Sequence, residues 1–110
     1  MAGCVFCQIV SGEREAEKVY EDKSTLAFYD IKPVAPIHVL VIPKIHLASI
    51  LEIKDKDLAY ELFNALQKTV RVLNLEDRGF RVITNTGKDG NQTVFHLHFH
   101  ILGGKSLTGF

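Results

Sequence analysis

Three histidines alternate with apolar residues near the end of the chain. Residues 95–102 read Phe-His-Leu-His-Phe-His-Ile-Leu, which puts His96, His98 and His100 at every second position. Because side chains alternate between the faces of a β-strand, the imidazoles are expected on one face, about 6.6–6.8 Å apart along the strand. The other face is expected to hold Phe95, Leu97, Phe99 and Ile101. Solubility does not require three histidines in register, so this row is predicted to have a chemical role.

Imidazole suits several chemical roles at neutral pH. One ring of such a row can act as a nucleophile while its neighbours donate or accept protons. A metal site made of all three rings is disfavoured, because side chains at adjacent i, i+2 positions cannot converge unaided on one tetrahedral ion. We therefore interpret the row as catalytic.

A second group of reactive residues lies at the start of the chain, where Cys4 and Cys7 form a C-x-x-C pattern. Two cysteines do not make a disulfide scaffold. A thioredoxin-like redox pair follows a strand in a βαβ pattern, and no strand is predicted before Cys4. Half of a metal site, a redox pair and a coincidence remain open, and histidines are available as the other two metal ligands.

Two segments have apolar residues at helical spacing. A short helix is predicted over residues 4–11, with Ser11-Gly12 as its stop. A longer helix is predicted between Asp55, as its cap, and Asn74. Its apolar stripe consists of Leu58, Ala59, Leu62, Phe63, Leu66, Val70 and Leu73. One or two helical turns are expected over residues 46–51.

Five segments have the composition of strands: residues 18–21, 25–30, 37–42, 79–85 and 93–102. The first two are expected to form a hairpin, and the third a central strand that Pro43 closes. His38 shares a face with Leu40 and Ile42 in this pattern, so we predict a packed, structural histidine. Together the segments predict an α+β fold with a mainly antiparallel sheet.

Length and charge narrow the possible functions. A chain of 110 residues is expected to form one domain with one core. Thirteen basic and thirteen acidic residues give a formal charge of zero. This balance argues against nucleic-acid binding by charge and against a polybasic membrane-surface protein. The sequence shows neither an apolar run of membrane-spanning length nor a basic signal region, so a cytoplasmic location is expected.

The sequence from His96 to Leu102 resembles the signature of the histidine triad (HIT) superfamily, with blocks in the order seen in its Hint branch, the histidine triad nucleotide-binding proteins. The matching blocks are residues 6–9, 26–31, 39–46, 85–87 and 92–95. The resemblance covers nearly the whole chain. It implies a single HIT domain over residues 1–110, a five-stranded antiparallel sheet with one long and one short helix, and a homodimer.

The resemblance also implies a purine nucleotide-binding hydrolase, a nucleoside phosphoramidase acting on AMP-amine type substrates through a nucleotidyl-histidine intermediate. His98 would be the nucleophile, and His96 would orient its surroundings through the chain. His100 would hydrogen-bond the phosphate or the bridging atom, and His46 would be a relay partner of His96. The alternatives are a nucleotide-binding regulatory protein with incidental hydrolysis and a dinucleoside polyphosphate hydrolase. The latter is disfavoured because the pattern that follows the triad in that branch is missing.

The family pattern assigns a nucleotide site to eight residues. Asp30 resembles the ribose ligand, and an apolar base slot is implied by Phe6, Ile9, Phe28 and Ile31. Asn85, Gln92 and Thr93 match positions at the phosphate, where backbone N–H groups of the loop from Gly87 are expected nearby.

Cys4, Cys7, His46 and His96 match the ligand set of zinc-binding members of the superfamily. Two thiolates and two imidazoles suit a closed tetrahedral Zn²⁺ site, which would clamp the first helix to the sheet and fix the His96 ring. The metal would be structural and would not be required for the chemistry. A purely zinc-dependent structural module is a weaker reading of the same residues.

Two departures from the family pattern fall in the implied nucleotide site. Arg14-Glu15 replaces an Ile-Pro or Leu-Pro that helps to line the base slot in some relatives. Asn91 replaces a glycine in the phosphate loop, and because Asn tolerates positive φ the turn is expected to survive.

Overall fold

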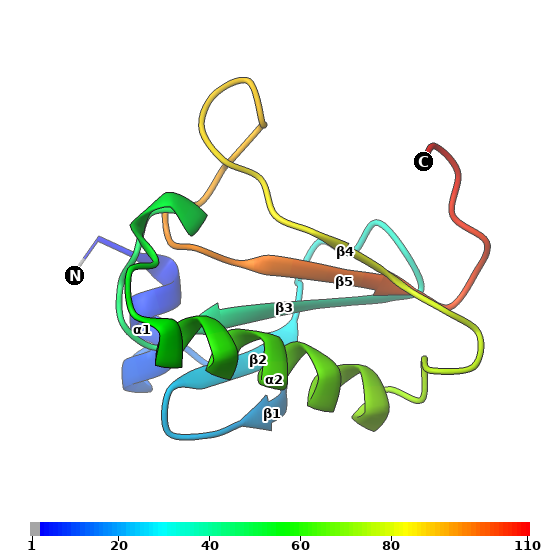
Figure 1. Cartoon of the computed structure of the whole chain (residues 1–110), viewed down its shortest axis with the longest axis horizontal. Coiled ribbons are helices and arrows are strands. Elements are labelled where there is room, and N and C mark those ends of the chain that lie inside the picture. The colour runs from blue at the N-terminus through cyan, green and yellow to red at the C-terminus, as the bar shows by residue number, and fades with distance from the viewer. Residues whose placement is uncertain (1–2) are drawn as a thin grey trace.

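A computed structural model describes residues 3–110 of the chain. One antiparallel sheet has the strand order β1-β2-β3-β5-β4 (Figure 1). Within the described residues the strands are β1 (Lys18–Glu21), β2 (Thr25–Tyr29), β3 (Ile37–Pro43), β4 (Arg81–Ile83) and β5 (Phe99–Gly103). The helices there are α1 (Val5–Ser11), the 3-10 turn η1 (Ile50–Glu52) and α2 (Lys56–Val72). The predicted fold, a five-stranded antiparallel sheet with one short and one long helix, is confirmed.

Both α-helices begin and end near the residues that the sequence indicates. The side chain of Cys4 caps α1 by accepting from the backbone N–H of Cys7, and Gly12 ends it in the left-handed conformation, with φ of 87°. Asp55 caps α2, and Asn74 follows it at φ 57°. Across residues 3–110, no helix is both long and apolar enough to span a membrane.

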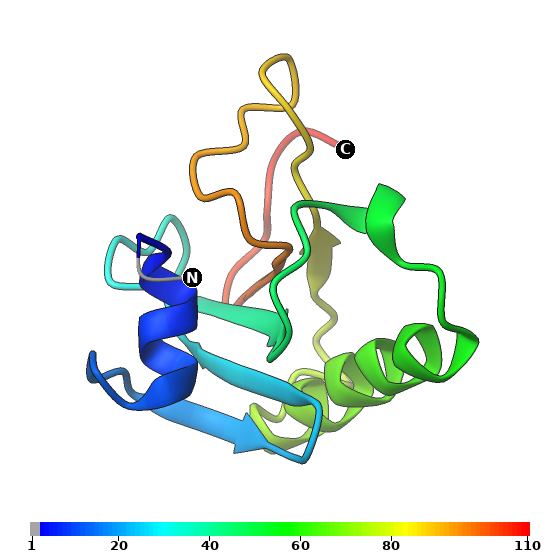
Figure 2. The same ribbon diagram turned by 90° about the vertical axis from the view of Figure 1, so that its left-hand side faces the viewer.

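The two helices cover opposite faces of the sheet (Figure 2). Alternate residues of β3 divide between them: Val39 and Val41 join the core beneath α2, whereas Leu40 and Ile42 join the core beneath α1. In the antiparallel register His100 lies opposite Leu40. The histidine row therefore lies on the α1 side of the sheet, so α1 packs on the same face as the histidines.

The last predicted strand is shorter than expected, because regular pairing begins at Phe99 rather than at Thr93. Phe99 pairs with Val41, so two residues further along the ladder Leu97 would pair with Pro43. Pro43 has no N–H to donate, and the N–H of Leu97 bonds the oxygen of Leu47 instead. Residues 93–98 thus approach the sheet as an irregular segment. The expected strand over 79–85 is likewise confined to Arg81–Ile83.

Two aromatic residues predicted in apolar faces are exposed. Phe95, at the start of the alternating row, is 59% exposed because it precedes the regular strand. Leu97, Phe99 and Ile101 are buried beneath α2, as the alternation predicts. Phe63, assigned to the buried stripe of α2, is 62% exposed. It lines a groove together with Phe80, which precedes β4, and Val82 of β4, at the edge of the sheet.

Candidate active site

A cavity of about 530 Å³ opens between α1, the strands β2 and β3, and the histidine segment. Its apolar wall includes Phe6, Ile9, Phe28 and Leu40. Its polar lining includes Asp30, Thr93, His38, His98 and His100. An apolar slot beside a few polar groups is the usual form of a small-ligand site. Two of the three alternating histidines thus face this cavity.

The ring of His98 is held by the main chain of its own segment. Its Nδ1–H donates to the carbonyl oxygen of His96 at 2.7 Å. A neutral imidazole carries one hydrogen, so Nε2 of His98 keeps its lone pair. Burial lowers the pKa of His98 below the ordinary imidazole value, which favours this neutral form at pH 7. The ring of Phe6, from α1, packs edge-on against His98 with centroids 5.1 Å apart.

His100 is paired with a histidine from the neighbouring strand. Its Nδ1 lies 2.9 Å from Nε2 of His38, and the latter nitrogen also lies 3.4 Å from Oδ2 of Asp30. Burial, together with the adjacent His98 and His38 rings, lowers the pKa of His100 to about 4. His38 is buried, as predicted, but it belongs to the polar wall of the cavity rather than to packing alone. The alternation along the strand predicts the face on which His38 lies, but it does not predict the contact with His100.

The four predicted metal ligands come together outside the lining of this cavity. Ligand atoms of Cys4, Cys7, His46 and His96 all lie within 4.8 Å of one another. Nδ1 of His96 is 3.4 Å from the sulfur of Cys4 and 3.5 Å from that of Cys7. Nδ1 of His46 is 3.3 Å from the sulfur of Cys7. Zn–N and Zn–S bonds of ordinary length at a tetrahedral angle place nitrogen and sulfur ~3.5 Å apart.

The hydrogen bonds of His96 also fit a metal ligand. Its Nε2–H donates to the carbonyl oxygen of Pro43 at 2.9 Å, so the neutral ring directs a bare Nδ1 at both sulfurs. Burial raises the pKa of Cys7, and the neighbouring Cys4 raises it further, so that two adjacent thiolates require a cation beside them. These residues fit Zn²⁺, which would supply a structural cross-link between α1 and the sheet.

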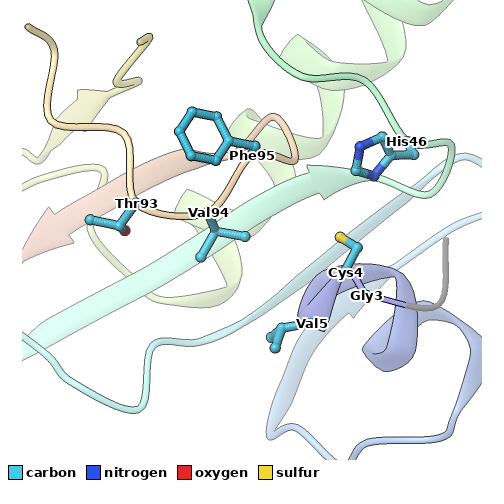
Figure 3. A pocket seen from close by; sticks show the side chains of 7 residues that line it. All are labelled: Gly3, Cys4, Val5, His46, Thr93, Val94 and Phe95. Carbon is cyan, nitrogen blue, oxygen red and sulfur yellow. The ribbon is translucent and has the colours of Figure 1, made fainter. Parts of the chain in front are cut away.

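A second hollow, of about 680 Å³, lies next to this cluster (Figure 3). Figure 3 shows Cys4 and His46 close to one another, beside the segment that carries Thr93, Val94 and Phe95. Thr93 and Val94 also line the cavity described above, so they form a wall common to both. His46 lies on the metal-cluster side of this wall, and its ring contacts that of His96 with centroids 4.9 Å apart.

Most of the predicted nucleotide ligands meet at the first cavity. Its lining includes Phe6, Ile9, Phe28, Asp30, Ile31 and Thr93. The base-slot residues differ in exposure: Phe6 is 6% exposed, whereas Ile31 is 91% exposed and forms the open rim. Arg14 and Glu15 lie on the same rim, and Nε of Arg14 donates to the side-chain oxygen of Gln8 at 3.2 Å.

Asn85 and Gln92 are not part of the cavity lining, and their side chains form hydrogen bonds with backbone groups instead. Nδ2 of Asn85 donates to the carbonyl oxygen of Gly90 at 2.7 Å. Oε1 of Gln92 accepts from the N–H of Gly87, while its Nε2 donates to the oxygens of Ala48 and Val94. These bonds give both side chains a role in shaping the loop. Asn91 keeps the turn at φ 60°, as expected for an asparagine at a glycine position.

Known proteins share the fold of this chain. Residues 11–107 match the HIT domain family. A histidine triad protein from Clostridium difficile is 46% identical, with a TM-score of 0.93 over 100% of this chain and 97% of that one. A HIT family hydrolase from Clostridium thermocellum is 40% identical, with a TM-score of 0.94 over the same shares.

A histidine triad nucleotide-binding protein from Candida albicans is 32% identical, with a TM-score of 0.85 over 98% of this chain and 85% of that one. The match to the family extends over most of the chain, and it includes the segment from which His98 and His100 face the cavity. The chain therefore belongs to the HIT domain family.

Proposed function

We propose that the protein hydrolyses nucleoside phosphoramidates of the AMP-amine type through a nucleotidyl-histidine at His98. The observation that carries this proposal is the hydrogen bond from Nδ1 of His98 to the oxygen of His96, because it leaves Nε2 as a nucleophile on the cavity wall. The similarity to a HIT family hydrolase and to a nucleotide-binding relative supports the same class of reaction.

The chemistry proceeds in two displacements at phosphorus. Nε2 of His98 attacks the α-phosphorus, the phosphorus–nitrogen bond of the substrate breaks, and the amine leaves with the electron pair after taking up a proton from solvent. Water then attacks the nucleotidyl-histidine and releases a proton to solvent, and the bond from phosphorus to His98 breaks to restore the neutral ring. Each cycle consumes one water and releases a nucleoside monophosphate and an amine. Imidazole is suited to this sequence because it is both a good nucleophile and a good leaving group.

The cavity offers a position for each part of such a substrate. The purine would lie in the apolar slot against Phe6 and Phe28, whose rings meet edge to face with centroids 5.5 Å apart. The ribose hydroxyls would donate to Asp30. The phosphate would lie between His98, His100 and the Thr93 hydroxyl, with the Zn²⁺ cluster supporting the site from behind.

The functional unit in this proposal is a homodimer of single HIT domains spanning residues 1–110. A groove of about 380 Å³ lies between the outer face of α2 and the segment around β4, and its apolar lining includes Phe63, Phe80 and Val82. β4 is an edge strand, so its outer side offers unpaired backbone groups. A second copy of the chain can cover both features with the same patch across a two-fold axis.

Mass spectrometry of the intact protein, mixed with an AMP-amine conjugate and quenched under denaturing, non-acidic conditions, tests the reaction. We expect one nucleotidyl adduct on the wild type and none on His98→Ala, with turnover reduced roughly 10⁴-fold or more. Lys54→Ala, at an exposed position away from the cavity, should behave as the wild type. Turnover that survives in His98→Ala would refute covalent catalysis there.

The same preparation separates the alternative functions. Tight binding of AMP or GMP by wild-type protein that turns over no phosphoramidate would identify a nucleotide-binding regulatory protein. Faster cleavage of a dinucleoside polyphosphate than of any phosphoramidate would place the activity at the phosphorus–oxygen bond.

A further inference from the structure

Arg14 lies at the mouth of the catalytic cavity, shortly after the end of α1. It lines the cavity together with Glu15, and both also line a neighbouring hollow of about 670 Å³ that shares this rim. The family pattern has an apolar residue at this position, so the guanidinium is a departure from it. An arginine here brings hydrogen-bond donors to the edge of an otherwise apolar slot.

Two hydrogen bonds to Gln8 hold Arg14 against α1. The backbone N–H of Arg14 donates to the backbone oxygen of Gln8 at 3.2 Å, and its Nε–H donates to Oε1 of the same residue, also at 3.2 Å. Nε carries one of the five N–H donors of a guanidinium, so the two terminal nitrogens keep four donors for a ligand. The ion pairs within residues 3–110 join other charged groups, so no carboxylate there is paired with Arg14.

The order of residues along α1 places Arg14 at the end of the cavity remote from His98. Phe6 packs against His98 with ring centroids 5.1 Å apart. Ile9 follows almost one helical turn later, ~4.5 Å further along the axis, and the helix ends at Gly12 just before Arg14. A nucleotide with its phosphate at His98 therefore has its base beside the last turn of α1, where Arg14 lies.

A purine in the slot turns one edge towards this rim. With its faces against Phe6 and Phe28 and its ribose at Asp30, the base directs outwards the edge that lies furthest from the ribose. This edge distinguishes the two common purines, because guanine presents O6 and N7 as two acceptors whereas adenine presents an amino donor beside N7. A guanidinium has only donors, so it can bond both guanine atoms at once but meets an amino hydrogen on adenine.

We infer that Arg14 is a specificity-determining residue, which gives the site a preference for guanine over adenine nucleotides by donating from its terminal nitrogens to O6 and N7 of the base. The inference rests on the proposed function for the orientation of the nucleotide. The bond from Nε to Gln8 restricts rotation of the guanidinium before the ligand arrives, which lowers the entropy lost on binding. A lysine would keep the charge but lack the planar pair of donors.

Two other roles for this cation make different predictions. A guanidinium stacked on the face of the base would strengthen the binding of every purine, because every base has a π-face. A general attraction to the phosphate would depend on charge alone, so lysine would replace arginine without loss. Only a contact with the edge of the base distinguishes O6 from an amino group.

Equilibrium binding of GMP, IMP and AMP to the full chain tests the inference without turnover. IMP has the O6 and N7 of guanine but no 2-amino group, so we expect GMP and IMP to bind about 10-fold more tightly than AMP. Arg14→Leu should weaken both by about 10-fold and change the affinity for AMP by less than about 2-fold. Arg14→Lys should lose most of the preference, whereas Lys23→Leu, which removes an exposed cation outside the cavity lining, should behave as the wild type.

The inference would be overturned by equal wild-type affinities for GMP and AMP, or by equal losses for all three nucleotides in Arg14→Leu. A preference for GMP that IMP does not share would assign the selectivity to the 2-amino group and would also overturn it. Arg14→Lys keeps the comparison available if Arg14→Leu does not fold. A protein with the expected preference that cleaves no phosphoramidate would refute the proposed reaction and leave this inference intact, whereas a protein that binds no purine nucleotide would refute both.

Discussion

The carbonyl oxygen of His96 accepts the Nδ1–H of His98 at 2.7 Å, while the ring of His96 faces the sulfurs of Cys4 and Cys7. One residue thus belongs to two sites: its main chain orients the proposed nucleophile and its side chain belongs to the cluster that fits a metal. This relationship connects the cysteine–histidine cluster to the wall of the cavity through one residue.

Zinc should stabilise the protein without being needed for turnover. Protein purified without chelator should contain about one zinc per chain, and Cys7→Ser should abolish this content. Metal at 100 times its Kd contributes about 2.7 kcal/mol. For a domain of this size its removal should lower the unfolding midpoint by on the order of 10 °C. Metal analysis and thermal unfolding, with Lys54→Ala as control, would check both values.

Activity per folded molecule should survive metal removal below the new midpoint, because the His96 ring keeps its bond to Pro43. A complete loss of turnover in a folded, metal-free protein would contradict a structural role.

Acid should destabilise the fold through the buried histidines. Burial lowers the pKa of His38, His98 and His100, the last to about 4, against an ordinary value near 6.5 in the unfolded chain. The unfolded state therefore binds more protons below pH 6.5, so the stability from these neutral rings is present above that pH and lost as the pH falls towards 4.

Thermal unfolding between pH 8 and pH 4 measures this effect. The midpoint should be nearly constant above pH 7 and should fall increasingly below 6.5. His100→Gln removes one of the titrating groups, so its midpoint should fall less steeply over the same range. Parallel curves for the two proteins would show that His100 does not titrate differently in the folded and unfolded states.

Gln92 should act on substrate binding through the loop that it braces. Gln92→Glu keeps the acceptor for Gly87 but replaces both donors, leaving the oxygens of Ala48 and Val94 facing a carboxylate. Unsatisfied buried groups cost about 1–3 kcal/mol each. We expect a lower unfolding midpoint and a KM raised about 10-fold, the equivalent of about 1.4 kcal/mol of lost binding. Unchanged values of both would argue against a bracing role.

A charge on the outer face of α2 should break the proposed dimer. Phe63→Glu puts a carboxylate into the apolar groove beside Phe80, where a second copy would have to desolvate it. Light scattering should give a dimeric mass for the wild type and for the control Lys68→Glu, an exposed position outside the groove lining, and a monomeric mass for Phe63→Glu. A monomeric wild type at micromolar concentration would refute the dimer.

Local patterns in the sequence predict the parts of the fold that depend on local physics. The stop of α1 at Gly12 and the cap of α2 at Asp55 need only neighbouring residues, and both are found where expected. Period-2 alternation gives the faces of β3 correctly, because each residue of a strand alternates regardless of what lies above it.

The remaining features depend on contacts between distant residues. Alternation continues through Phe95, but the ladder stops where Pro43, more than fifty positions earlier, has no N–H to offer. His38 looks like a packed residue because its partner His100 is 62 positions away. Phe63 fits the apolar stripe of α2, but its exposure depends on the distant residues around β4, which leave it 62% exposed within residues 3–110.

The bond from the His96 ring to the Pro43 carbonyl has an evolutionary consequence. The ring is held once by the chain itself and a second time by the sulfurs of Cys4 and Cys7. Loss of either cysteine in a descendant would remove one restraint and leave the other, so selection on the chemistry would tolerate it. A substitution of His96 itself would not be tolerated in this way, because it removes both restraints on the ring at once. Cys4 and Cys7 are thus the residues of this cluster that a lineage can lose one at a time, with a loss of thermal stability and not of the reaction.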